Sequence, residues 1–126
     1  MLRVFKDLKI NLNNPLVKAS HIVFSARPGD MESKDDYYFT DTNLVVMETS
    51  LNNYNTTNYD YFHYDSLPCW LRCLVATRIA TNASQWAKYF FDYHSGTHNN
   101  QWVIVDYNQY ANQKSNIEKA HDIGIK

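Results

Sequence analysis

Apolar and polar residues alternate along residues 21–49 in the pattern of β-strands. Residues 21–25, 36–40 and 43–49 are short runs rich in Val, Ile, Phe, Tyr and Thr. The first run ends at the Arg-Pro-Gly-Asp sequence of residues 27–30, which is typical of a turn, and residues 41–42 are short enough for a tight connection. We therefore predict three antiparallel strands over residues 21–49.

The pattern changes to that of helices after a polar, tyrosine-rich segment, residues 50–66, which we predict to be a loop. Ser66 can cap a first helix, and Pro68 is tolerated in its first turn. The apolar residues that follow at helical spacing predict one buried stripe, formed by Trp70, Leu71, Leu74, Val75 and Ile79. Thr81, Asn82 and Ser84 are candidate caps of a second helix, which carries Trp86, Tyr89, Phe90 and Tyr93 and ends near Gly96.

The two ends of the chain are less regular. Leu2, Phe5 and Leu8 have a spacing that shares one helical face, so we predict a helical turn or two over residues 1–9. The Trp-Val-Ile-Val run of residues 102–105 predicts a last strand, and the chain becomes polar beyond Tyr110. Together these elements predict an α+β fold, and 126 residues are enough for one domain and no more.

Charge and hydropathy exclude several classes of partner. The formal net charge is −1 and Lys and Arg do not cluster, so we expect no nucleic acid partner. The longest apolar runs, such as residues 44–47, are far below the roughly 20 residues that a membrane span needs. Residues 1–6 are too charged for a signal peptide, so we expect neither a transmembrane segment nor a signal peptide in this chain.

Two cysteines, Cys69 and Cys73, lie four residues apart. They are either two buried thiols on one helical face or a disulfide, which would strain a regular helix. A zinc site needs about four ligands, and the sequence has no second cysteine pair. We therefore assign no metal and no cofactor.

Two sites fit the acceptor pattern for N-glycosylation: Asn55 (Asn-Thr-Thr) and Asn82 (Asn-Ala-Ser). This pattern matters only in a protein that enters the secretory pathway. Asn55 is the better candidate because it lies in the predicted loop, whereas Asn82 is also a candidate helix cap.

Residues 94–107 read His-Ser-Gly-Thr-His-Asn-Asn-Gln-Trp-Val-Ile-Val-Asp-Tyr. This segment resembles the Ser-Gly-Thr-Tyr-Asn-Asn-Gln-Trp signature of the phospholipase B-like family, which also continues into an apolar strand. Residues 44–49 are similar to the family's Leu-Val-Thr-Leu-Glu-Thr strand, and residues 35–38 to its preceding hairpin. The resemblance covers about residues 1–110, and residues 111–126 diverge.

The resemblance implies one partial domain, residues 1–126, of a four-layer αββα N-terminal-nucleophile hydrolase, with antiparallel strands and two consecutive helices. In this family a cysteine released by self-cleavage attacks a lipid ester or amide carbonyl, and its α-amino group acts as base. That cysteine precedes, and the later catalytic asparagine follows, the segment that this chain resembles. The chain is therefore expected to be an internal fragment that lacks its nucleophile and is inactive alone.

The resemblance also implies a lysosomal or secreted protein whose partners are a lipid or amide substrate and the remainder of the hydrolase fold. Two alternatives stay open: a non-catalytic scaffold or interaction subunit, and a truncated gene remnant.

Four residues are candidates for the substrate pocket. Asn99 and Asn100, between a helix end and a strand start, can supply donors to an oxyanion hole, or they organise the turn through bonds to the backbone. Glu48 and Thr49 end the third predicted strand, whose edge lines the pocket by analogy with the family fold. The alternative for this pair is a solvated strand end.

Overall fold

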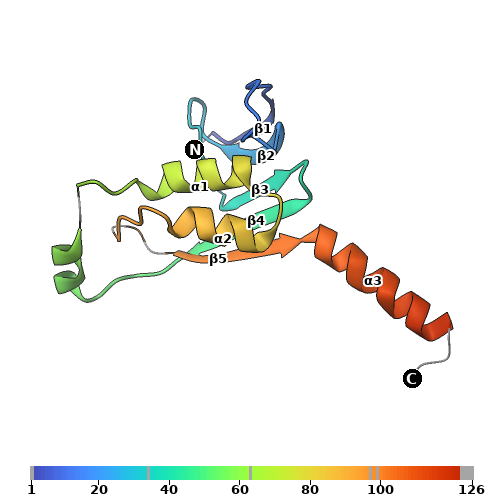
Figure 1. The fold of residues 1–126 in the computed structure, drawn as a ribbon. Coiled ribbons are helices and arrows are strands. Elements are labelled where there is room, and N and C mark those ends of the chain that lie inside the picture. The colour runs from blue at the N-terminus through green and yellow to red at the C-terminus, as the bar shows by residue number, and fades with distance from the viewer. Residues whose placement is uncertain (1, 34, 63, 97, 99, 123–126) are drawn as a thin grey trace.

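The computed structural model describes residues 2–33, 35–62, 64–96, 98 and 100–122. In this part of the chain one antiparallel sheet has the order β1 (Val4–Lys9), β2 (His21–Ala26), β3 (Tyr37–Thr40), β4 (Leu44–Ser50) and β5 (Asn100–Asp106). The helices are η1 (Thr56–Tyr61, a 3-10 helix), α1 (Cys69–Ile79), α2 (Ala83–Phe91) and α3 (Tyr107–Asp122). Figure 1 shows α1 and α2 lying over one face of the sheet and α3 projecting away from it. The predicted α+β class is confirmed.

The predicted strands over residues 21–49 are confirmed as β2, β3 and β4, and their turns form as the sequence indicates. Gly29 has a φ of +86°, and the Asp30 N–H donates to the Arg27 carbonyl at 3.2 Å. Asn43 has a φ of +62°, which asparagine tolerates better than most residues, and its N–H donates to the Thr40 carbonyl at 3.2 Å. The second turn joins β3 directly to β4, whereas the first begins the longer connection from β2 to β3.

The helix predicted over residues 1–9 is wrong, because Val4–Lys9 forms β1 and pairs with β2. Leu8 packs against the core, whereas Phe5 is 68% exposed on the opposite face. The spacing of Leu2, Phe5 and Leu8 fits a helical face, but Val4, Lys6 and Leu8 also fit one face of a strand. Pairing with the open edge of β2 decides between the two.

The predicted buried face of α1 is also wrong. The helix buries Arg72, Cys73, Ala76, Thr77 and Arg78, whereas Trp70 and Val75 of the predicted stripe are 46% and 42% exposed. Ser66 does not cap this helix, since the helix begins after Pro68, in the N-cap position, and has no side-chain cap. The polar side chains can be buried because they find hydrogen-bond acceptors inside the fold. The Arg78 guanidinium, for example, donates to the Ala19 and Ser20 carbonyls at 3.0 and 3.3 Å.

The N-terminus of α2 is as predicted, and its C-terminus is not. The Asn82 side chain accepts a hydrogen bond from the Gln85 N–H at 2.8 Å, as an N-cap does. The helix ends at Phe91 rather than near Gly96, because Asp92 is extended, with a ψ of 135°, and Tyr93 follows in a left-handed conformation with a φ of +57°. The predicted loop over residues 50–66 is confirmed except that Ser50 ends β4 and η1 forms within it.

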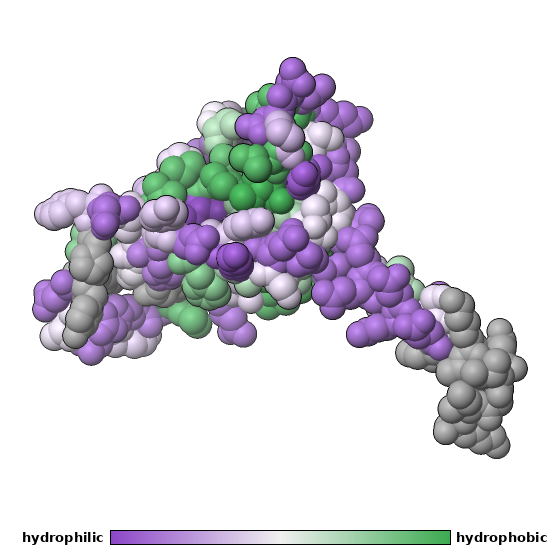
Figure 2. Space-filling model, viewed as in Figure 1, coloured by the Kyte–Doolittle hydropathy of each residue, from purple (hydrophilic) through white to green (hydrophobic). Residues whose placement is uncertain are grey.

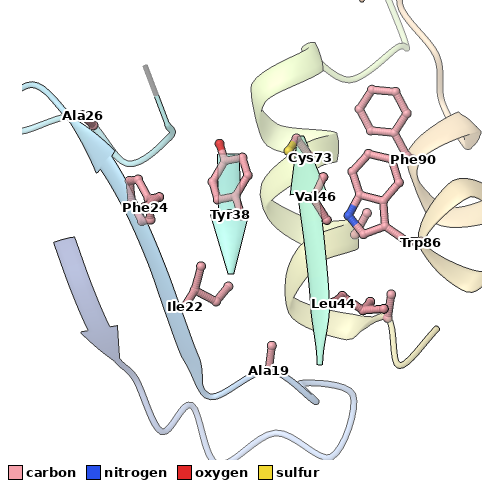
Figure 3. Packing of buried hydrophobic residues seen from close by; sticks show 12 residues of the cluster. Ala19, Ile22, Phe24, Ala26, Tyr38, Leu44, Val46, Cys73, Trp86 and Phe90 are labelled. Carbon is pink, nitrogen blue, oxygen red and sulfur yellow. The ribbon is translucent and has the colours of Figure 1, made fainter. Parts of the chain in front are cut away.

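The core lies between the sheet and the two helices, as Figure 3 shows. Trp86 stacks on Phe90 with ring centroids 4.8 Å apart, and its indole N–H donates to the Thr77 hydroxyl at 3.0 Å. The buried hydrophobic cluster comprises Ala19, Ile22, Phe24, Ala26, Tyr38, Leu44, Val46, Cys73, Ala76, Ala80, Trp86 and Phe90. The helices therefore hold the sheet through one aromatic layer.

The opposite face of the sheet has no covering layer among the described residues. Phe39, Met47 and Val103 lie on this face and are 49%, 36% and 46% exposed. Hydrophobic side chains also gather on the outer side of α1, as Figure 2 shows. Apolar surfaces of this kind are typical of interaction sites, with other protein, with membranes or with ligands.

Candidate functional site

A cavity of about 410 Å³ lies where the end of β4 and the start of β5 meet the N-terminus of α1. Glu48 and Ser50 of β4 contribute to its wall, and Asn100 and Trp102 of β5 pair directly with Ser50 and Glu48. Directly paired residues point to the same face of a sheet, so all four side chains lie on the helix-covered face. The cavity is completed by Glu32, Ser33, Asp36, Tyr38, Pro68, Cys69, Trp70, Cys73 and His98.

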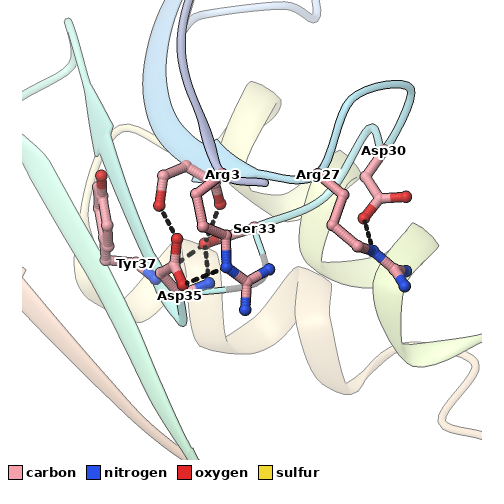
Figure 4. A network of polar contacts seen from close by, with 7 residues as sticks. Arg3, Arg27, Asp30, Ser33, Asp35 and Tyr37 are labelled. Carbon is pink, nitrogen blue, oxygen red and sulfur yellow. Dashed lines mark hydrogen bonds and ion pairs between the residues drawn. The ribbon is translucent and has the colours of Figure 1, made fainter. Parts of the chain in front are cut away.

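Ser33 makes several hydrogen bonds within the connection between β2 and β3 (Figure 4). Glu32 and Asp36 of this connection line the cavity. The Ser33 hydroxyl donates to the Ser25 carbonyl and accepts from the N–H groups of Asp35 and Tyr37, each at 3.2 Å. The Ser33 N–H donates to the Tyr38 hydroxyl at 2.8 Å, which ties the connection to the core. Ser33 therefore ties the described residues of this connection to β2 and to the core.

Glu48 and Asp36 form a carboxyl pair in this cavity. The Glu48 N–H donates to the Asp36 carbonyl at 3.0 Å, which draws the two residues together. Burial raises the pKa of the Glu48 carboxyl to about 7, and the negative charges of Asp36 and Glu32 add to this shift. Hydrogen bonding by Asn100 acts in the opposite direction on that pKa, because it stabilises the carboxylate. Glu48 is thus poised to change its protonation near neutral pH.

The four candidates from the sequence do not all meet in the cavity. Glu48 and Asn100 lie in it, and one side-chain oxygen of each, Oε2 and Oδ1, is shielded from solvent without a hydrogen-bond partner. Thr49 pairs with Gln101, is exposed, and lies on the other face of the sheet, as the alternation along β4 requires. Asn99 is outside the described residues. Glu48 itself is half buried, whereas Thr49 and Ser50, which follow it at the end of β4, are exposed.

A second cavity, of about 320 Å³, adjoins the first. His98, Asn100 and Trp102 line both cavities. The remaining wall of the second cavity is mostly apolar. It comes from α2 and β5, with Trp86, Ala87, Phe90, Phe91 and Ile104, and from His94 beyond the end of α2. The two cavities therefore differ in polarity and share three wall residues, His98, Asn100 and Trp102.

The sequence-based prediction of the site did not include several residues that line the cavity: Glu32, Asp36, Tyr38, Trp70 and Trp102. Tyr38, Asp36 and Trp102 fall inside segments that resemble the phospholipase B-like family, but only the fold shows that they face one cavity. Glu32 carries no such signal, because it reaches the cavity through the β2–β3 connection.

Both cysteines are free thiols, so the disulfide alternative does not occur. Burial raises the pKa of the Cys73 thiol to about 12 and also raises that of Cys69. A thiol whose pKa is raised is a poor nucleophile at neutral pH. Among the described residues, no group of three or more His, Cys, Asp or Glu is placed to hold a metal ion.

The two glycosylation candidates differ in their surroundings. Asn55 is exposed, and its side-chain oxygen accepts from the Thr57 hydroxyl at 2.7 Å. Asn82 is half buried and caps α2. Glycosylation of either residue stays a prediction. In the described part of the chain, no helix has both the length and the apolar character to cross a membrane.

The pH dependence of stability tests the environment of Glu48. Its folded-state pKa lies above the ordinary value, so the folded state holds a proton more tightly and the free energy of unfolding falls as pH rises from about 4.5 to 7. We expect Glu48→Gln to raise the free energy of unfolding at pH 8 by about 1–2 kcal/mol, a value reduced because solvent screens this partly exposed side chain. At pH 4 the substitution should change the free energy of unfolding little, because Glu48 is then protonated. Urea unfolding at both pH values measures this, with Thr49→Ala as control. Equal effects of Glu48→Gln at both pH values would contradict it.

Fold and site together define a class of protein: an α+β unit with a carboxyl-lined cavity at the ends of its strands. A family model described as Phospholipase B matches residues 1–123, beyond the stretch of residues 1–110 on which the resemblance rests. The chain is 41% identical to phospholipase B-like protein A of Dictyostelium discoideum over 112 residues, which are 87% of this chain and 20% of that protein. It is 36% identical to phospholipase B-like 1 of Bos taurus over 124 residues, 98% of this chain and 22% of that protein.

A third relative, putative phospholipase B-like 2 of Homo sapiens, is 39% identical over 114 residues, which are 85% of this chain and 19% of that protein. The chain belongs to the phospholipase B family. It spans about a fifth of the length of these relatives.

Proposed function

We propose that the chain forms one wall of the substrate pocket of a phospholipase B-like hydrolase that cleaves ester or amide bonds of lipids. The observation that carries this proposal is the meeting of Glu48 and Asn100 in one cavity at the ends of two adjacent strands. Asn100 supplies a side-chain N–H to the oxyanion that forms when a carbonyl is attacked, a role that Asn99 can share. Membership of the phospholipase B family supports the lipid substrate.

The nucleophile of this proposal is a cysteine in a part of the protein outside the chain, as the resemblance implies. Cys69 and Cys73 are unsuited to the role because the pKa of each thiol is raised by burial. The exposed sheet face that carries Phe39 and Met47 packs against the second sheet of the hydrolase in this proposal. The compartment that we propose is the lysosome or the extracellular space, in line with the resemblance.

The exposed apolar face also favours one alternative, a non-catalytic scaffold or interaction subunit. Such a protein needs the packing face but has no use for an oxyanion donor. Hydrolytic activity therefore separates the two functions.

The test is hydrolysis by the longest natural product that carries residues 1–126. Release of fatty acid from a lysophospholipid and from an N-acyl amine is measured for the wild-type protein and for Asn100→Ala. We expect Asn100→Ala to lower kcat/KM about a hundredfold, the effect of removing one oxyanion donor. Thr49→Ala, on the opposite face of the sheet, is the control and should keep wild-type activity.

Circular dichroism of Asn100→Ala checks that the variant folds. Full activity in a folded Asn100→Ala would remove the proposed role of this residue. If the wild-type product cleaves neither substrate, the scaffold function replaces the hydrolase.

A further inference from the structure

Glu48 lies between two side chains that form hydrogen bonds with it in different protonation states. Its carboxyl group is within hydrogen-bonding reach of the Asp36 carboxyl group and of the Asn100 amide. The contact with Asn100 lowers the pKa of Glu48, so it is a donation from the amide N–H to the carboxylate. A hydrogen bond between two carboxyl groups, in contrast, needs a proton on one of them. The preferred partner of Glu48 therefore depends on its proton.

The surroundings of Glu48 favour its protonated form. The Oε2 atom of Glu48 is shielded from solvent and has no hydrogen-bond partner, so a negative charge there is poorly compensated. Glu32 and Asp36 add negative charge to the same cavity. Among the described residues, no Lys or Arg lines this cavity.

The other titratable groups around the cavity do not change this balance. Those in the described part of the wall are Tyr38 of β3, Cys69 and Cys73 of α1, and His98, which precedes β5. Burial raises the pKa of the Tyr38 hydroxyl and of both thiols, so these three groups stay neutral near pH 7. His98 is exposed, so solvent screens any charge that it carries. Arg72 of α1 is not part of the wall and donates to two backbone carbonyls.

We propose that the protonation of Glu48 controls whether Asn100 can serve as the oxyanion donor of the site. A protonated Glu48 donates to Asp36 and leaves the side-chain N–H of Asn100 free for the oxyanion. An ionised Glu48 holds this N–H in a charge-assisted hydrogen bond, which is stronger than a neutral one. Glu48 is thus a positioning residue that acts through Asn100. This inference rests on the proposed function, because it describes the regulation of the same site.

The pH dependence of hydrolysis tests this control. In the longest natural product that carries residues 1–126, kcat/KM should fall as pH rises through about 7, where Glu48 loses its proton. We expect a fall of about tenfold between pH 6 and pH 8.5, less than the loss of the whole donor causes. Glu48→Gln is neutral at every pH and should remove this fall.

Asp36→Asn tests the second partner. Asp36 has a φ of +61°, a conformation that asparagine also tolerates, so the backbone should be unchanged. The substitution removes a negative charge that helps to raise the pKa of Glu48. The fall in kcat/KM should therefore move to lower pH by roughly half a unit to one unit. Thr49→Ala, on the opposite face of the sheet, is the control and should keep the wild-type pH profile.

Two further measurements show whether Glu48 acts through Asn100. The NMR signal of the Asn100 side-chain amide, assigned by its loss in Asn100→Ala, should titrate near pH 7 in the wild-type protein and not in Glu48→Gln. In Asn100→Ala the fall in kcat/KM between pH 6 and pH 8.5 should shrink to about threefold or less, because the two residues are coupled. Simple repulsion between Glu48 and the oxyanion would leave the fall at its full size.

The inference is overturned if wild-type kcat/KM does not fall near pH 7, or if Glu48→Gln keeps the fall. It is also overturned if the fall is unmoved in Asp36→Asn or undiminished in Asn100→Ala. The hydrolase function would survive each of these results, whereas a product that hydrolyses nothing would remove the proposed function and the inference together. Hydrolysis whose fall is lost in Glu48→Gln, moved in Asp36→Asn and reduced in Asn100→Ala would support both.

Discussion

Trp86→Ala is expected to lower the free energy of unfolding by about 3–5 kcal/mol, a large fraction of the stability of a domain this size. Trp86 is 1% exposed, and its ring lies 4.8 Å from that of Phe90 and 5.2 Å from that of Trp102. Its indole N–H donates to the Thr77 hydroxyl of α1 at 3.0 Å. The substitution removes a contact to α1, α2 and β5 at once and leaves a cavity at their junction.

Urea unfolding of the longest natural product, followed by circular dichroism, measures this loss. Trp70→Ala is the matched control, because Trp70 is 46% exposed and its removal should cost only about 1–2 kcal/mol. Equal losses for the two variants would mean that Trp86 does not hold the helices to the sheet.

Arg72→Ala should have the second large effect, lowering the free energy of unfolding by about 3–4 kcal/mol, because two hydrogen bonds made by a charged group are lost. The Arg72 guanidinium is buried and donates to the carbonyls of Leu67 and Phe90 at 3.0 and 2.6 Å. It also lies 4.5 Å from the centre of the Phe90 ring. Burial lowers the pKa of this guanidinium, so part of the hydrogen-bond energy is offset by the cost of removing the charge from water.

The same urea experiment measures the loss, and Arg27→Ala is the control. Arg27 pairs with Asp30 at 2.8 Å on the surface, and such pairs contribute no more than about 1 kcal/mol. Arg72→Lys should be intermediate, because an ammonium group cannot reproduce the two-directional contacts of a guanidinium. A loss for Arg72→Ala no larger than that for Arg27→Ala would show that the two carbonyl contacts contribute nothing.

The contrast between α1 and the strands shows which parts of the fold the sequence can predict. The strands over residues 21–49 follow from alternation and from turn residues such as Gly29 and Asn43, whose conformations are local properties. The buried face of α1 is different, because Arg72 and Arg78 are buried only by virtue of carbonyl groups that distant segments supply. A helical stripe chosen by polarity cannot detect such partners.

The candidate site shows the same limit. Asn100 was predicted from a family signature and Glu48 from the end of a strand, and both lie in the cavity. Thr49 was predicted with its neighbour Glu48, although adjacent residues of a strand point to opposite faces. Asp36 and Glu32 reach the cavity through contacts of Ser33 with residues on either side of it, which no spacing in the sequence reveals.

The order of the strands has a consequence for biosynthesis. β1 to β4 follow one another along the chain, whereas β5 pairs with β4 only after η1, α1 and α2 have been made. During synthesis the edge of β4 is therefore unpaired for longer than any other edge inside the sheet, and open edges invite pairing with other chains. When β5 pairs with β4, it covers that edge and places Asn100 in the same cavity as Glu48. The nascent chain therefore completes its pocket wall and loses its exposed strand edge in one step.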